Sequence, residues 1–303
     1  MIDLTLLGCG GYMPLPSRRL TACALRSGGF GMLIDCGEGT QLAIRESGLT
    51  MKPISAILLT HYHADHIAGL PGMLLSMGNE NRREPVDVYG PEGLEKIAGA
   101  IRAFAPELPF EIRLHPLKME EASLSVGPYT VTAFPLQHRV PCLGYCVELP
   151  RAGKFSPEKA RENGVPVEIW SRLQKSGDAE WNGTFYTRDM VMGGPRRGIK
   201  LLYATDTRPV PAIARIGKNA DLMILEGMYG DPEKQARCEE SSHMLMNEAA
   251  QLAAEAHAEV LWFTHYSPAL TEPEEALIWP REIFPACEAG CDGKRTQIKF
   301  KND

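Results

Sequence analysis

Three histidines and one aspartate lie within six residues in the first quarter of the chain. His61, His63, Asp65 and His66 follow an apolar run, Ile57 to Leu59, that predicts a buried strand. In an extended chain, residues two apart point the same way, so His61 and His63 can reach one cation from the strand end. Asp65 and His66 lie where the chain turns into a helix and could hold a second cation. Imidazole and carboxylate ligands suit zinc, and also manganese or iron.

Four further strand-like runs each end in one residue of ligand or catalytic type. His138 follows YTVTAFPLQ, Asp206 follows KLLYAT, Glu226 follows DLMIL in sequence, and His265 follows EVLWFT. Strands of one sheet end along a common edge, so these residues are expected to converge on the histidine-rich motif. Asp35 lies in a glycine-rich turn and is expected to satisfy backbone amides there rather than bind a metal.

Composition is that of an ordinary globular protein of one large domain or two small ones. The chain has 303 residues, of which 44% are apolar and 23% charged. No apolar run approaches the roughly 20 residues that cross a bilayer, and no signal segment follows Met1, so a cytoplasmic location without membrane contact is expected. The net charge of −6 argues against sequence-independent binding of nucleic acid over the whole surface, but it leaves room for a local basic track. The eight cysteines are expected to be mostly buried thiols.

The order of the patterns predicts a hairpin-rich sheet first and helices later. Helices are expected over 67–77, 91–104 and 244–257, and strands over 2–8, 86–90, 199–205, 221–227 and 259–265, with several more between 109 and 148. An apolar strand followed by Thr-His-Tyr occurs twice, at 58–62 and at 262–266, which favours two similar halves with helices outside two sheets. Residues 151–199 differ in character and predict a protruding insertion with two short helices.

Several motifs together resemble those of a known superfamily. They are HYHADH at 61–66, DCGEGTQ at 35–41, ATDTRP at 204–209 and THYS at 264–267. With these motifs the chain resembles the metallo-β-lactamase superfamily and, within it, the ribonuclease Z family of transfer RNA 3′-processing endonucleases. The similarity extends over nearly the whole length. It includes 151–199, which is similar to the segment that carries the family's RNA-gripping arm.

The resemblance implies an α/β fold, a four-layer αββα sandwich formed by a single domain over 1–303, with 151–199 as a small protruding arm-like insertion. It also implies two divalent metal ions, zinc first, with manganese or iron as alternatives. Carried over by motif, one metal would be held by His61, His63 and His138, the other by Asp65, His66 and His265, and Asp206 would bridge them.

The resemblance further implies an activity. The chain would be a metal-dependent phosphodiester hydrolase that cuts the 3′ trailer from transfer RNA by attack of an activated water, and would work as a homodimer. Asp65 would accept the proton of the water. His243 would contact the scissile phosphate or protonate the leaving oxygen, and Glu226 would orient His243.

The chain departs from the family pattern around these last two residues. Leu225 stands where the family has histidine, Gly227 and Met228 replace Ala-Thr, and Met244 follows His243 where the family has serine. Hydrolysis is therefore a firmer expectation than the RNA substrate. The alternative is a phosphodiesterase for small substrates such as cyclic nucleotides. A redox di-iron protein and a non-catalytic binding protein are weaker alternatives, because His63 stands where the di-iron variant carries a carboxylate and because a scaffold needs no open dinuclear site.

Overall fold

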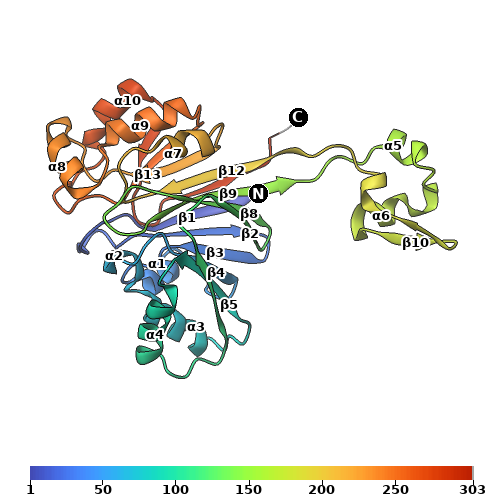
Figure 1. Cartoon of the computed structure of the whole chain (residues 1–303), viewed down its shortest axis with the longest axis horizontal. Coiled ribbons are helices and arrows are strands. Elements are labelled where there is room, and N and C mark those ends of the chain that lie inside the picture. Colours follow the sequence, from blue (N-terminus) through green and yellow to red (C-terminus); the bar gives the residue numbers. More distant parts are fainter. Residues whose placement is uncertain (302–303) are drawn as a thin grey trace. The chain divides into compact units, whose positions relative to one another are not determined.

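A computed structural model describes residues 1–301, and within these residues the chain forms two seven-stranded sheets and one small separate hairpin (Figure 1). The first sheet has the order β16 (Arg295–Ile298), β1 (Ile2–Gly8), β2 (Ala22–Ser27), β3 (Phe30–Ile34), β4 (Ile54–Leu58), β5 (Val86–Pro91) and β6 (Ile112–Leu117). The second has the order β15 (Cys287–Ala289), β14 (Leu261–Thr264), β13 (Leu222–Glu226), β12 (Arg196–Ala204), β9 (Leu143–Arg151), β8 (Tyr129–Pro135) and β7 (Ala122–Val126).

Each sheet combines a parallel and an antiparallel part. In the first sheet β3 to β6 pair in parallel, and in the second sheet β12 to β15 do so. The carboxyl ends of neighbouring parallel strands lie at one edge of a sheet, which is where ligand sites of such sheets form. Both sheets therefore offer a row of strand ends from which side chains can converge.

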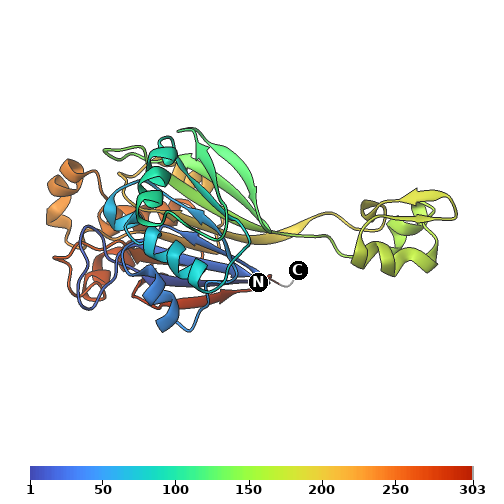
Figure 2. The same cartoon turned by 90° about the horizontal axis from the view of Figure 1, so that it is seen from below.

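Helices cover the outer faces of both sheets. Beside the first sheet lie α1 (Thr40–Glu46), α2 (Ala64–Ile67), α3 (Leu70–Asn79) and α4 (Leu94–Phe104). Beside the second lie α7 (Pro211–Ile216), α8 (Gln235–Ser241), α9 (Met246–Glu255) and α10 (Ile278–Ile283). Figure 2, turned by 90°, shows the cyan helices α3 and α4 in front of the first sheet. No helix among residues 1–301 combines the length and apolar character needed to span a membrane.

Apolar side chains fill the space between the sheets and the space beneath the helices. Leu4, Leu25 and Ile34 from the first sheet meet Val147 and Tyr203 from the second. A second buried cluster joins the outer face of the first sheet to α1, α3 and α4; it includes Leu33, Ile57, Ala43, Leu74 and Ile101. Seven of the eight cysteines are buried, and all eight are free thiols in the described chain, as the sequence predicts.

Some expected element boundaries are wrong, for local reasons. The helix expected from residue 91 begins at Leu94, because Pro91 still pairs with Leu117 in the sheet and Gly93 takes a left-handed φ of 100°. The helix expected from residue 67 is divided at Gly69 into α2 and α3. The helix expected over 244–257 covers Met246–Glu255 and is preceded by an extended Leu245.

The chain divides into two compact units. Residues 1–149 and 199–299 form the first, and the second takes in residues 150–198 with Phe300 and Lys301. The second unit contains α5 (Pro157–Glu162), α6 (Trp170–Ser176) and a hairpin of β10 (Ala179–Trp181) and β11 (Thr184–Tyr186). Its core is formed by buried apolar side chains, among them Val165, Ile169 and Leu173. The two short helices match expectation; the hairpin was not predicted, although its Asn182-Gly183 turn is a strong hairpin signal.

In the first unit, the loop after β3 and the turn that carries the histidine-rich motif are joined by backbone hydrogen bonds. Cys36 N–H donates to the His66 carbonyl at 2.7 Å, and Gly69 N–H donates to the Cys36 carbonyl at 2.9 Å. A Cβ atom on Gly69 would lie 2.1 Å from the Gly37 carbonyl oxygen, and one on Gly37 would lie 2.5 Å from the Asp65 carbonyl oxygen. The loop after β3 thus lies directly against the turn that carries the histidine-rich motif.

We predict that Gly69→Ala destabilises the protein. Its new methyl group would overlap a backbone oxygen that cannot rotate away, so the free energy of unfolding should fall by about 1–3 kcal/mol or more in urea titrations. Gly99→Ala is the control, because Gly99 is exposed on α4 with open space around its Cα, and that change should raise stability by up to about 1 kcal/mol. Unfolding of Gly69→Ala at the wild-type urea midpoint would contradict the steric argument.

Candidate metal centre

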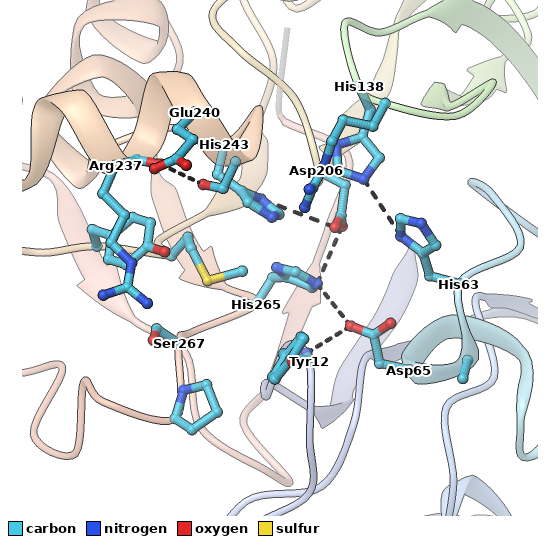
Figure 3. Close-up of a pocket in the computed structure, with 16 residues that line it drawn as sticks. Tyr12, His63, Asp65, His138, Asp206, Arg237, Glu240, His243, His265 and Ser267 are labelled. Atoms are coloured by element: carbon cyan, nitrogen blue, oxygen red, sulfur yellow. Dashed lines mark hydrogen bonds and ion pairs between the residues drawn. The ribbon is translucent and has the colours of Figure 1, made fainter.

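Seven residues predicted from separate parts of the sequence meet at one edge of the sandwich, and Figure 3 shows five of them, His63, Asp65, His138, Asp206 and His265. They come from the turn after β4, from α2, and from segments that follow β8, β12 and β14. Their ligand-type atoms form two groups, each with all atoms within 4.8 Å of one another: His61, His63, His138 and Asp206 in one group, and Asp65, His66 and His265 in the other.

Asp206 lies between the two groups. Its Oδ2 atom is 3.1 Å from His66 Nε2 and 3.2 Å from His265 Nε2, and its Oδ1 atom is 3.9 Å from His61 Nε2. The residue is 2% exposed, and Oδ2 accepts no hydrogen bond of normal geometry from any residue between 1 and 301. A buried carboxylate oxygen in this position is available to a cation shared by both groups.

Hydrogen bonds on the outer side of the rings set which nitrogen faces the centre. His61 Nδ1 lies 3.1 Å from the Thr60 hydroxyl, and His66 Nδ1 lies 2.8 Å from Asp35 Oδ2. The Nε2 atom of each ring therefore faces the centre, where it is available to a metal ion. Asp35 also accepts hydrogen bonds from the Thr60 amide at 2.8 Å and from the Thr60 hydroxyl. Asp35 thus satisfies a backbone amide, as expected, but this amide belongs to Thr60 after β4 rather than to its own turn, and the contact of Asp35 with His66 was not expected.

His138 is held in the same manner, and His63 completes the first group through its Nδ1 atom. His138 Nδ1 donates to the Ser242 carbonyl at 3.2 Å, and its Nε2 lies 3.4 Å from His63 Nδ1. His63 Nδ1 is also 2.9 Å from His61 Nε2. Ring nitrogens at such distances cannot all be paired by protons, whereas a shared cation would satisfy their lone pairs together.

Backbone geometry turns three of these side chains inward. Asp35, Asp206 and His265 each come just after a strand and have φ values of 59°, 58° and 56°. This left-handed region is uncommon for residues other than glycine, although Asp and His adopt it more readily than most. The sharp turn carries each side chain toward the shared edge instead of along the strand.

The charges of the centre are strongly interdependent. Burial lowers the pKa of His61 well below its ordinary value, and His66 lowers it further. Burial also opposes protonation of His66, but the Asp206 and Asp35 carboxylates outweigh it and raise the pKa of His66. Burial would raise the pKa of Asp206, yet His265, His66 and His61 hold that pKa well below the usual range. The Asp206 carboxylate thus stays ionised and requires positive charge beside it.

This donor set fits divalent metal ions. It combines several neutral imidazoles with ionised carboxylates, and it contains an orphaned carboxylate oxygen between two groups of ring nitrogens. Zinc, manganese and iron all accept such nitrogen and oxygen ligands. Cations here would compensate the buried negative charge, which otherwise costs several kcal/mol per uncompensated ion.

A second buried pair, Glu226 and His243, lies beside the centre. Glu226 is fully buried at the end of β13, accepts from the Thr207 amide at 2.7 Å through Oε1, and meets His243 Nδ1 at 2.9 Å through Oε2. Burial would lower the pKa of His243, but Glu226 outweighs burial and raises it. Both residues therefore lie together as the sequence predicts.

The centre opens into a cavity of about 570 Å³. His63, Asp65, His138, Asp206, His243 and His265 line it, together with Met228 and with Ser267 of the THYS motif. Five further residues that line it belong to none of the sequence motifs: Tyr12, Arg139, Tyr229, Arg237 and Glu240. These rim residues lie in loops and in α8, and no spacing in the sequence links them to the motif. The cavity is large enough for part of a nucleotide.

Comparison with known proteins identifies two matching family models. Residues 2–97 match the model described as anti-Pycsar protein Apyc1, and residues 163–266 match the model described as a beta-lactamase superfamily domain. Each model covers less than half of the chain, so neither alone defines its family.

Full-length relatives are more informative. The chain is 51% identical over 304 residues to a protein named ribonuclease Z from Lachnoclostridium phytofermentans, with 100% of both chains covered. It is 46% identical over 303 residues to a ribonuclease Z from Lachnospira eligens, again with 100% of both covered. The crystal structure of the short form of human tRNase Z matches with a TM-score of 0.72 and 24% identity, covering 98% of this chain and 100% of that one. This likeness confirms the predicted αββα metallo-β-lactamase sandwich.

We predict that Asp35→Asn weakens metal binding without unfolding the protein. Asn tolerates the left-handed φ of this position but removes the negative charge that orients His66, so metal affinity should fall about 10–100-fold. The change is to be measured by chelator competition. Asp87→Asn is the control, because Asp87 pairs with His115 at 2.8 Å outside the centre, and its loss should leave affinity unchanged. Equal affinities of Asp35→Asn and wild type would show that His66 needs no such partner.

Proposed function

The chain belongs to the ribonuclease Z family and is a metal-dependent hydrolase, and on this premise we propose that it removes the 3′ trailer from precursor transfer RNA. The observation that carries the proposal is the pair of ligand groups with Asp206 between them, at the floor of a cavity lined by Arg139 and Arg237. The guanidinium groups suit an anionic substrate. The substrate itself rests on the names of the full-length relatives.

We further propose that two divalent ions, zinc first, occupy the centre. His61, His63 and His138 would hold one ion, Asp65, His66 and His265 would hold the other, and Asp206 would contact both. When bound, such a pair lowers the pKa of a water and neutralises charge on a phosphodiester. The close ligand distances and the depressed pKa of Asp206 support this assignment.

In this proposal Asp65 accepts the proton of the attacking water. Burial would raise the pKa of Asp65, but the hydrogen bond from His265 and the charge of His66 outweigh burial and hold the pKa below its usual range. The carboxylate faces the cavity, with Oδ2 held by the Tyr12 amide at 2.7 Å and lying 3.4 Å from His265 Nε2. It is thus fixed beside the centre.

His243 is proposed to protonate the leaving oxygen. Its Nδ1 atom is occupied by Glu226, which leaves Nε2 for the substrate, and its raised pKa favours the protonated form that a general acid needs. Glu226 is a positioning residue, since it is fully buried and holds His243 through one oxygen while the Thr207 amide holds the other.

We also propose that the protein works as a cytoplasmic homodimer and that the inserted segment 151–199, nearly all of which lies in the second unit, grips the RNA. These proposals follow the family resemblance. Support for the gripping role comes from the unit's own buried core, which lets it hold a defined surface.

We predict cleavage of a precursor transfer RNA with a 3′ trailer when zinc or manganese is supplied. Asp65→Asn should reduce this activity by about 10²–10⁴-fold, because it removes the proton acceptor. Hydrolysis of bis(p-nitrophenyl) phosphate, measured in parallel, should fall as well, and metal content measured on the same samples separates lost chemistry from lost metal. Turnover of the small diester alone would favour a small-substrate phosphodiesterase, and turnover of neither would contradict both functions.

We predict that His243→Ala affects the two substrates unequally. The 3′ oxygen of RNA needs a proton as it leaves, whereas p-nitrophenolate leaves readily without one. RNA cleavage should therefore fall about 10²–10⁴-fold while hydrolysis of the small diester changes little. Equal losses on both substrates would assign His243 to phosphate binding instead.

A further inference from the structure

Tyr12 is an exposed aromatic residue at the mouth of the candidate active site. Its side chain is 77% exposed, although it lines the cavity that contains Asp65 and His265 (Figure 3). Its φ of 71° lies in the left-handed region, which is unfavourable for a bulky side chain. Because the Tyr12 side chain is exposed, its strained backbone conformation does not help to pack the core. Residues with strained backbone conformations are concentrated at functional sites.

The backbone of Tyr12 is anchored to the centre itself. Its N–H donates to Asp65 Oδ2 at 2.7 Å, and the preceding Gly11 N–H donates to the Tyr266 carbonyl at 3.0 Å. Gly11 also lies against the imidazole of His265, since a Cβ atom there would be 2.5 Å from Cε1 of that ring. The backbone from which the Tyr12 ring projects is therefore fixed beside two proposed metal ligands.

Arg18 anchors the other end of the loop that contains Tyr12. Its Nη1 atom donates to the Leu270 carbonyl at 2.9 Å, and its guanidinium lies 5.0 Å from the centre of the Tyr266 ring. The loop from Gly10 to Arg18 is thus tied to the segment after β14 at both ends. A ring presented in this way is preorganised for a ligand.

Resting on the proposed function, we infer that Tyr12 is a stacking platform for the base of a nucleotide next to the scissile phosphate. Cationic Arg139 and Arg237 line the same cavity and suit the phosphates of an RNA, and Tyr12 supplies the flat apolar face that a base needs. Stacking of a base on an aromatic ring tolerates any sequence, because every base has a π face. Tyr12 would therefore position single-stranded RNA for cleavage without reading its sequence.

The test uses Tyr12→Gly, because glycine adopts the positive φ without strain and the variant should fold at least as well as wild type. Tyr12→Phe keeps the ring, and Phe104→Ala removes an aromatic side chain that is 73% exposed outside the cavity. Three forms of precursor transfer RNA are compared: a natural one, one with an abasic nucleotide on the 5′ side of the cleavage position, and one with an abasic nucleotide on its 3′ side. Thermal stability and elution volume are measured for every variant.

We expect Tyr12→Gly to lower kcat/KM on natural RNA by roughly 5- to 100-fold, mainly through KM, and to have no effect on the RNA that lacks the stacked base. Tyr12→Phe and Phe104→Ala should behave as wild type. An unchanged kcat/KM for Tyr12→Gly would overturn the inference, as would an equal loss on natural RNA and on both abasic RNAs. Dissociation of a dimer by Tyr12→Gly would instead make Tyr12 a subunit contact. Failure of the wild-type protein to cleave RNA would refute the proposed function itself, a separate result.

Discussion

Negative charge buried at the shared edge of the two sheets is the constraint on which the rest of the structure depends. Asp35, Asp206 and Glu226 are at most 2% exposed. An uncompensated buried carboxylate costs several kcal/mol, so each needs a fixed partner. Asp35 has the Thr60 amide and His66, and Glu226 has the Thr207 amide and His243. Asp206 alone keeps an oxygen without a normal hydrogen bond within residues 1–301, and it is the one that faces both ligand groups.

The backbone around these charges is correspondingly rigid. The loops that carry Asp35 and His66 approach so closely that a methyl group on Gly37 or Gly69 would meet a carbonyl oxygen. Left-handed φ values at Asp35 and His265 cost energy locally, and regular strand pairing on the preceding residues stabilises them. Similar ligand side chains stay close together in the absence of a cation only if the backbone, rather than the side chains themselves, fixes their positions.

Much of this centre could be predicted from the sequence, because its residues follow apolar strands and strand ends share an edge. The seven proposed ligands were found in that way, and the family resemblance is confirmed by the full-length relatives. The contact of Asp35 with His66 could not be predicted. It depends on β3 lying beside β4 with Ile34 opposite Leu58, a register that no local pattern encodes. The position of Tyr12 could not be predicted either, because it results from contacts between loops that are distant in sequence.

The residues that depart from the family pattern around Glu226 and His243 are buried, and one of them, Met228, also lines the cavity. Leu225 precedes Glu226 in β13, and neighbouring strand residues point to opposite faces, so Leu225 packs away from the Glu226 carboxylate and is fully buried. Met244 and Leu245 are likewise buried behind His243. The hydrogen bond between Glu226 and His243 survives at 2.9 Å. The changed residues therefore still allow Glu226 to hold His243 beside the centre.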